Sequence, residues 1–159
     1  MKHRIQWGKL AVSLAIPLAV GGLAAFLTRD GMKLFAMVKQ PPLSPPAWLF
    51  PVVWTILYLM MGAASYLVCT AGVSETRRSR ALTVYGLSLA ANFLWPILFF
   101  TVEAWLLALF LLLVLWILVA VSALLFSAID NRAGKLMLPY LVWLSFAVYL
   151  NVGVWLLNK

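Results

Sequence analysis

Five long apolar runs without a charged side chain decide what this chain can fold into. They comprise residues 10–28, 48–70, 81–102, 104–129 and 136–157, and none contains Asp, Glu, Lys, Arg or His. Crossing a bilayer core of about 30 Å takes roughly 20 helical residues. Lipid offers no partners to backbone polar groups, and the runs lack the alternation of barrel strands. The sequence therefore predicts an all-α membrane protein, a bundle of five transmembrane helices.

Composition supports this fold class. The 159 residues are 65% hydrophobic and 10% charged, whereas a soluble domain is about half apolar and about a quarter charged. We expect one domain over residues 1–159, because the helices have only each other to pack against. The first run is too long for a signal peptide and has no cleavage site before Arg29, so it is predicted to remain as a span.

The basic residues lie between the runs, where they orient the chain and attract anionic headgroups. The net charge of +8 therefore points to the membrane surface, and we expect no nucleic-acid partner. Lys and Arg number eight on the side of the N-terminus and four on the side of the first loop. This count predicts a cytoplasmic N-terminus. We expect an integral protein of a bacterial cell membrane.

The connection from Arg29 to Ala47 is the only long one between spans. A possible amphipathic turn or two at residues 32–38 precedes four prolines within residues 41–46. Prolines so close together force an extended, stiff segment without helix. Because long ordered loops are usually functional, we interpret this Pro-rich first loop as a lid, with Phe35, Pro41, Pro45 and Pro46 as its lid residues.

Several kinds of chemistry lack the residues they need. The only histidine, His3, lies in the N-terminal tail, Cys69 is the only cysteine, and no carboxylate falls within a span. We therefore expect no metal site, no proton relay, no catalytic triad and no required cofactor.

Aromatic residues are abundant and fall in stripes. Trp7, Trp48, Trp105 and Trp155 lie near span ends, as an aromatic belt predicts, but four others lie deep. Residues three or four apart share a helix face, which gives three stripes: Trp54, Tyr58 and Met61; Asn92, Trp95 and Phe99; and Trp143, Phe146, Ala147, Leu150 and Asn151. These stripes favour the walls of an apolar pocket with two amide anchors. The alternative is that the tryptophans simply pack the bundle while the amides join helices.

Small residues and proline add two expectations. The pairs Gly21/Ala25 and Gly86/Ala90 are four residues apart and could let helices approach closely, so each could form a dimer face. Pro96, beside Trp95, is expected to kink the third helix and open space nearby.

The motifs are then recognisable together. Pro45-Pro46-x-Trp48, Trp54-Thr55-x-Leu57-Tyr58-x-x-Met61-Gly62, Asn92-x-x-Trp95-Pro96-x-x-Phe99-Phe100 and Pro139-Tyr140-x-x-Trp143-x-x-Phe146-Ala147-x-x-Leu150-Asn151 resemble those of the TspO/MBR family, the tryptophan-rich sensory proteins and translocator proteins. The resemblance covers all five spans in order. It implies a five-helix bundle, usually a homodimer, that binds tetrapyrroles such as protoporphyrin IX and haem between its helices; sterols also bind family members. By motif position, Trp54, Asn92, Trp95, Trp143, Ala147, Leu150 and Asn151 match the ligand site.

Three departures from the family pattern bear on function. Leu34-Phe35 stands where the family has a Trp-Tyr pair, and Leu43 stands where it has a further Trp. The lid therefore lacks two aromatic contacts and a redox-capable phenol. Val152 and Leu156 replace the Tyr and Arg of the animal sterol-recognition pattern, which argues against cholesterol as the natural ligand.

The leading hypothesis is a membrane-embedded binding protein, a sensor, receptor or transporter, for porphyrin- or haem-type ligands. Its proposed ligand-binding residues are Trp54, Tyr58, Asn92, Trp95, Phe99, Trp143, Phe146, Ala147, Leu150 and Asn151, with Gly86 and Ala90 at a homodimer interface. Two alternatives stay open: an enzyme that degrades porphyrin in light, which Phe35 weakens, and an oligomeric membrane scaffold.

The predicted orientation can be tested at Cys69. This residue lies at the end of the second apolar run, shortly before Arg77, so it is expected near the cytoplasmic end of that helix. A membrane-impermeant maleimide should leave Cys69 unlabelled in intact cells and label it only after permeabilisation. Labelling in intact cells would invert the orientation and leave the fold class unchanged.

Overall fold

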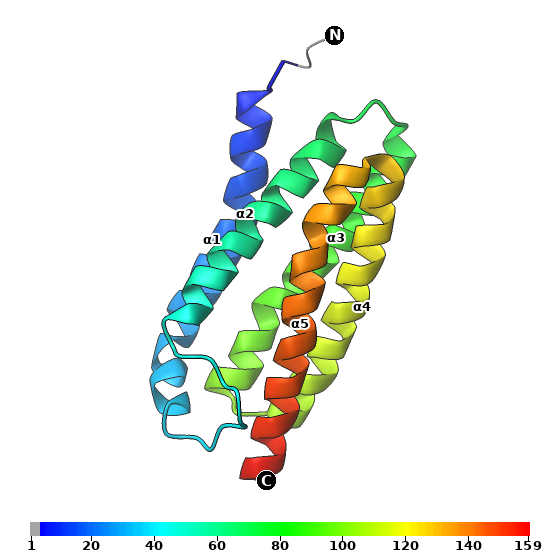
Figure 1. The fold of residues 1–159 in the computed structure, drawn as a ribbon. Coiled ribbons are helices and arrows are strands. Elements are labelled where there is room, and N and C mark those ends of the chain that lie inside the picture. Colours follow the sequence, from blue (N-terminus) through cyan, green and yellow to red (C-terminus); the bar gives the residue numbers. More distant parts are fainter. Residues whose placement is uncertain (1–3) are drawn as a thin grey trace.

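A computed structural model describes residues 4–159 as five long helices that run up and down in turn (Figure 1). They are α1 (Trp7–Phe35), α2 (Leu49–Thr70), α3 (Glu75–Pro96), α4 (Trp105–Ile129) and α5 (Asn131–Asn158), and a π-helical turn, η1 (Ile97–Thr101), continues α3. All five are long and apolar enough to cross a membrane. The predicted fold class is confirmed.

Three helices extend beyond the charge-free runs that predicted them. The first continues past Arg29 to Phe35, α3 begins at Glu75, and α5 begins at Asn131. The runs mark the hydrocarbon thickness, whereas a helix can continue among headgroups until a cap ends it. Residues 29–35 of the segment predicted as loop are therefore helix, and residues 36–48 connect α1 to α2.

Side-chain caps start the two helices that begin early. The Ser74 hydroxyl accepts a hydrogen bond from the Arg77 N–H at 3.4 Å, and the Asp130 carboxylate accepts one from the Arg132 N–H at 2.9 Å. The Arg132 guanidinium also donates to Asp130, which holds the pKa of that carboxyl below its usual range. Asp130 therefore stays ionised, as a helix N-terminus prefers.

The helices form a ring in the order α1, α2, α5, α4, α3, closed by contacts of α1 with α3 and η1. The α1–α2 loop and the C-terminus lie at one end of the bundle, and the α2–α3 and α4–α5 connections lie at the other (Figure 1). Met61, Phe126, Met137 and Leu144 are fully buried at the centre of the main core. A smaller cluster around Phe99, Ala108 and Val154 packs against Phe35 and Trp105.

Pro96 marks a change in helix type. The α-helix ends there, and in the next turn the Val102 N–H bonds to the Ile97 carbonyl at 3.0 Å, a spacing of five residues. Proline has no N–H for the α-helical ladder, and π turns are wider than α turns. This wider turn carries Phe99 and Phe100. Phe99 stacks on Trp95, with ring centroids 4.9 Å apart.

Candidate functional site

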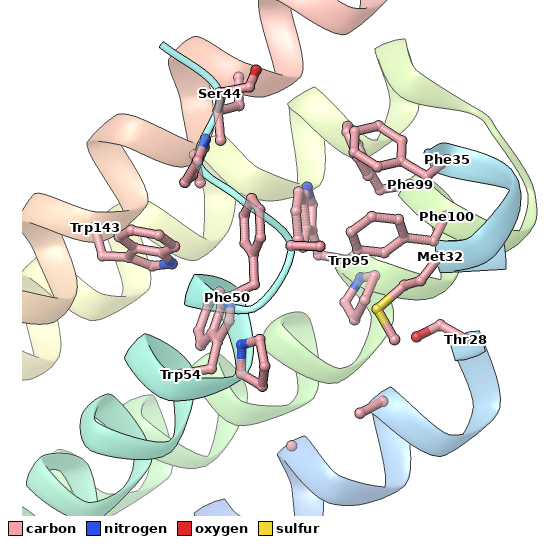
Figure 2. A pocket seen from close by; sticks show the side chains of 18 of the residues that line it. Thr28, Met32, Phe35, Ser44, Phe50, Trp54, Trp95, Phe99, Phe100 and Trp143 are labelled. Atoms are coloured by element: carbon pink, nitrogen blue, oxygen red, sulfur yellow. The ribbon is translucent and has the colours of Figure 1, made fainter. Parts of the chain in front are cut away.

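A cavity of about 400 Å³ lies among the helices, and residues of the α1–α2 loop form part of its lining. Residues of α1, α2, α3, η1, α5 and the loop line it, and Figure 2 shows aromatic side chains reaching it from several of these elements. Its volume falls within the range of about 300–1,000 Å³ that is usual for small-molecule sites.

Eight of the ten predicted ligand-binding residues line this cavity: Trp54, Tyr58, Asn92, Trp95, Phe99, Trp143, Ala147 and Leu150. The helical spacing of the three stripes identified these residues, because each stripe turns one face inward. Two other predicted residues, Phe146 and Asn151, lie outside the lining. The structure thus brings together most of the predicted set.

The aromatic wall is built from rings in mutual contact. Trp54 stacks on Tyr58 with centroids 5.5 Å apart, and it meets the edge of Trp143 at 6.4 Å and of Tyr140 at 6.0 Å. Phe50 meets Trp143 at 5.9 Å. Rings prefer such offset and edge-to-face contacts, so the wall is pre-formed and largely apolar.

A short chain of hydrogen bonds joins two polar residues of the lining, Tyr58 and Asn92, to Tyr140, which lies outside the lining. The Tyr58 hydroxyl donates to Asn92 Oδ1 at 2.8 Å, and Asn92 Nδ2 donates to the Tyr140 hydroxyl. Asn92 is 3% exposed, and an amide buried away from water needs such partners. The chain joins α2, α3 and α5 and fixes the orientation of the Asn92 amide.

Asn151 holds the wall without lining it. Its Oδ1 accepts a hydrogen bond from Trp95 Nε1 at 3.1 Å, and its Nδ2 donates to the Trp105 carbonyl at 2.8 Å. Asn151 is fully buried. It therefore fixes the indole plane of Trp95 and joins α5 to α3 and α4.

The other tryptophans divide between belt and packing. Trp7 and Trp48 are 71% and 66% exposed near helix ends, as a belt requires. Trp105 is half-buried and packs on the cluster around Phe99, so it is not a simple belt residue. Trp116 lies deep but away from the cavity, and its Nε1 donates to the Ser145 hydroxyl at 3.0 Å.

The Pro-rich loop contributes to the cavity lining and is fastened to α5. Phe35 and Pro45 line the cavity, whereas Pro41 and Pro46 do not. The Asn158 side chain accepts a hydrogen bond from the Lys39 N–H at 3.2 Å and donates to the Lys39 carbonyl at 2.8 Å. The Tyr149 hydroxyl donates to the Pro42 carbonyl at 2.6 Å.

Close packing adds to these bonds. A Cβ built at Gly153 of α5 would lie 2.5 Å from the Pro41 ring, so only glycine leaves room for the proline there.

Leu43, at the tip of the α1–α2 loop, is 84% exposed and has a backbone φ of 66°. A side chain other than glycine rarely adopts this left-handed backbone.

Comparison with known proteins agrees with this architecture. The sequence model of the TspO/MBR family matches residues 13–156. The tryptophan-rich protein TspO of Chlorobaculum tepidum is 34% identical, over 94% of this chain and 95% of its own length. TspO of Archaeoglobus fulgidus is 35% identical, over 94% of this chain and 97% of its own length. The translocator protein of Bos taurus is 34% identical, over 94% of this chain and 90% of its own length. The chain belongs to the TspO/MBR family.

Sequence reasoning missed the part of this TspO/MBR cavity that α1 supplies. Gly21, Ala25, Thr28 and Met32 all line it, but they form no aromatic stripe. The only signal was the Gly21/Ala25 pair, suggested above as a dimer face. That suggestion is wrong for this pair, because Gly21 is buried and the Tyr58 ring occupies the place of a Cβ.

Phe50 and Phe100 were also missed, although both line the cavity. Gly86 and Ala90 lie on an exposed face of α3, with nothing within 4 Å of a Cβ built at Gly86. A homodimer through these two residues stays a prediction.

The hydrogen-bond chain at Asn92 predicts a coupled loss of stability. Asn92→Leu leaves the buried Tyr140 hydroxyl without its donor and should cost about 0.5–2 kcal/mol. In a protein that already carries Tyr140→Phe and so lacks that hydroxyl, Asn92→Leu should lower the free energy of unfolding by less. Unfolding of the two single variants and the double variant in detergent measures the coupling. Additive losses would show that the contact contributes nothing to stability.

Proposed function

We propose that this protein binds porphyrin-type tetrapyrroles, with or without iron, in the cavity under the α1–α2 loop and acts as a membrane sensor, receptor or transporter for them. The observation that carries the proposal is a pre-formed cavity lined largely by aromatic rings. The described lining contains no Asp, Glu, Lys, Arg or His. Relatives support the role through their names, which include "tryptophan-rich sensory protein" for that of Cereibacter sphaeroides, 33% identical.

The cavity walls suit the large, flat, apolar ring system of a macrocycle. Trp54, Trp95, Phe99 and Trp143 offer ring faces and edges from three helices. A macrocycle that buries several hundred Å² gains about 25 cal/mol per Å² of apolar surface. After the costs of association, this supports affinity on the order of micromolar. The amide of Asn92 supplies an anchor of fixed orientation.

The α1–α2 loop acts as the lid of this site, because Gln40, Ser44 and Pro45 form the lining at the end of the bundle. With Leu34 and Leu43 in place of family tryptophans, the lid makes fewer ring contacts. A homodimer through the exposed face of α3, at Gly86 and Ala90, completes the proposal.

Two cavity substitutions test the binding site. Trp54→Ala removes a stacking ring and should weaken protoporphyrin IX binding roughly five- to a hundredfold. Ala147→Phe fills the cavity and should weaken binding similarly. Absorbance titration of each purified variant measures the affinity. Trp116→Ala is the matched control, since Trp116 lies outside the cavity. If it weakens binding as much as Trp54→Ala, the site is elsewhere.

Light-dependent porphyrin degradation is the second candidate, favoured by the oxidisable indoles and phenol of Trp54, Tyr58, Trp95 and Trp143 in the lining. Phe35 stands at the position where the family has a tyrosine, and its ring centroid lies 5.2 Å from those of Phe99 and Phe100. Phenylalanine has no hydroxyl to oxidise, so degradation should be slow. Phe35→Tyr should speed light-driven absorbance loss and change affinity little. Fast degradation by the native protein would rank the enzyme above the binder.

A further inference from the structure

A second hollow of about 520 Å³ lies between α2 and α5. It is lined by Val53, Ile56, Leu57, Met60, Pro139, Val142, Trp143 and Phe146. All eight side chains are apolar, and Val142 is 71% exposed on a membrane-spanning helix. This hollow, the α2–α5 groove, therefore opens to lipid. It accounts for Phe146, which faces the groove and not the cavity.

Among the described residues, Trp143 alone belongs to the lining of both hollows. It touches Phe50 and Trp54 on the cavity side, at 5.9 and 6.4 Å between centroids, and Phe146 on the groove side at 5.6 Å. Figure 2 shows its indole reaching from α5 towards Phe50 and Trp54. The Trp143 side chain therefore lies at the boundary between the cavity and the α2–α5 groove.

The Trp143 indole is held less firmly than its counterpart on α3. Trp95 stacks on Phe99 and donates to Asn151 at 3.1 Å. Within residues 4–159, Trp143 has tilted and edge contacts, but its indole N–H donates no hydrogen bond. A rotamer change of Trp143 breaks ring contacts only, whereas one of Trp95 also breaks a buried hydrogen bond.

The end of the bundle, in contrast, is fastened. Opening the α1–α2 loop there must break the hydrogen bonds of Asn158 with Lys39 and of Tyr149 with Pro42, and must separate Pro41 from Gly153. A ligand with a large apolar ring system also partitions into the bilayer, because transfer of apolar surface out of water is favourable.

We propose that the α2–α5 groove is the membrane-side entrance to the cavity and that the Trp143 indole is its gate. The tetrapyrrole enters from lipid along the groove and passes when the indole rotates, while the loop stays closed above it. The proposal rests on the proposed function, because it takes the cavity to be the ligand site. An entrance controls the rates of binding and release and leaves the dissociation constant unchanged.

Filling the groove tests the entrance. Val142→Trp adds bulk to the groove without reaching the cavity lining. Leu124→Trp on α4 is the matched control, because Leu124 is also 71% exposed and lines neither hollow. Each protein is reconstituted in phosphatidylcholine vesicles and mixed with donor vesicles carrying protoporphyrin IX. The Soret absorbance reports the binding rate, and dilution into empty vesicles reports the release rate.

The expected result is that Val142→Trp slows binding and release together, by about fivefold or more, with a dissociation constant within about twofold of the native one. Leu124→Trp should match the native rates. Tyr149→Phe, which removes the bond to Pro42, should leave both rates unchanged.

Two results overturn the entrance while the binding site stands. In the first, Val142→Trp binds and releases protoporphyrin IX at the native rates while Tyr149→Phe does so faster, which places the route under the loop. In the second, Val142→Trp releases protoporphyrin IX faster and has a higher dissociation constant, which an entrance alone would leave unchanged. If the native protein binds no protoporphyrin IX, the proposed function fails first, and the entrance fails with it.

Discussion

The structure depends on the absence of hydrogen-bonding partners in lipid. A polar side chain within the spans must therefore find its partner inside the bundle. Asn92 does so with Tyr58 and Tyr140, and Asn151 with Trp95 and the Trp105 carbonyl. The two amides thereby join α2, α3, α4 and α5 at defined positions. They lie beside the cavity and set the orientation of two of its rings.

Aromatic packing then keeps the cavity open. A bundle packed with flexible aliphatic side chains could close over such a space, whereas rings braced edge to face resist collapse. Trp54 is braced by Tyr58, Tyr140 and Trp143, and Trp95 is braced by Phe99 and Asn151. The π turn after Pro96 contributes Phe99 and Phe100. The same arrangement leaves Trp143 as the less firmly held ring, which is why its indole is proposed as the gate between the cavity and the α2–α5 groove.

Much of this was predictable from sequence, for physical reasons. Charged residues are excluded from hydrocarbon, so the charge-free runs located all five helices. Helix ends among headgroups carry no such signal, which is why α1, α3 and α5 extend beyond the charge-free runs. Stripe spacing found Trp54, Asn92 and Trp143 because aromatic and amide residues stand out among aliphatic ones. It could not find Thr28 or Met32, whose role depends on which face of α1 meets Tyr58. Stripe spacing also could not show that Asn151 lies outside the lining, because Asn151 is one turn from Ala147 on the same stripe.

The central claim is that the aromatic cavity is a tetrapyrrole site, and an equilibrium titration of the native protein tests it most directly. Purified protein in detergent is titrated separately with protoporphyrin IX, haem and a sterol, while tryptophan fluorescence is recorded. The account predicts saturable quenching at one porphyrin per chain, with a dissociation constant on the order of micromolar, and weaker binding of the sterol. Porphyrin binding no stronger than to protein-free micelles, or tighter binding of the sterol, would contradict it.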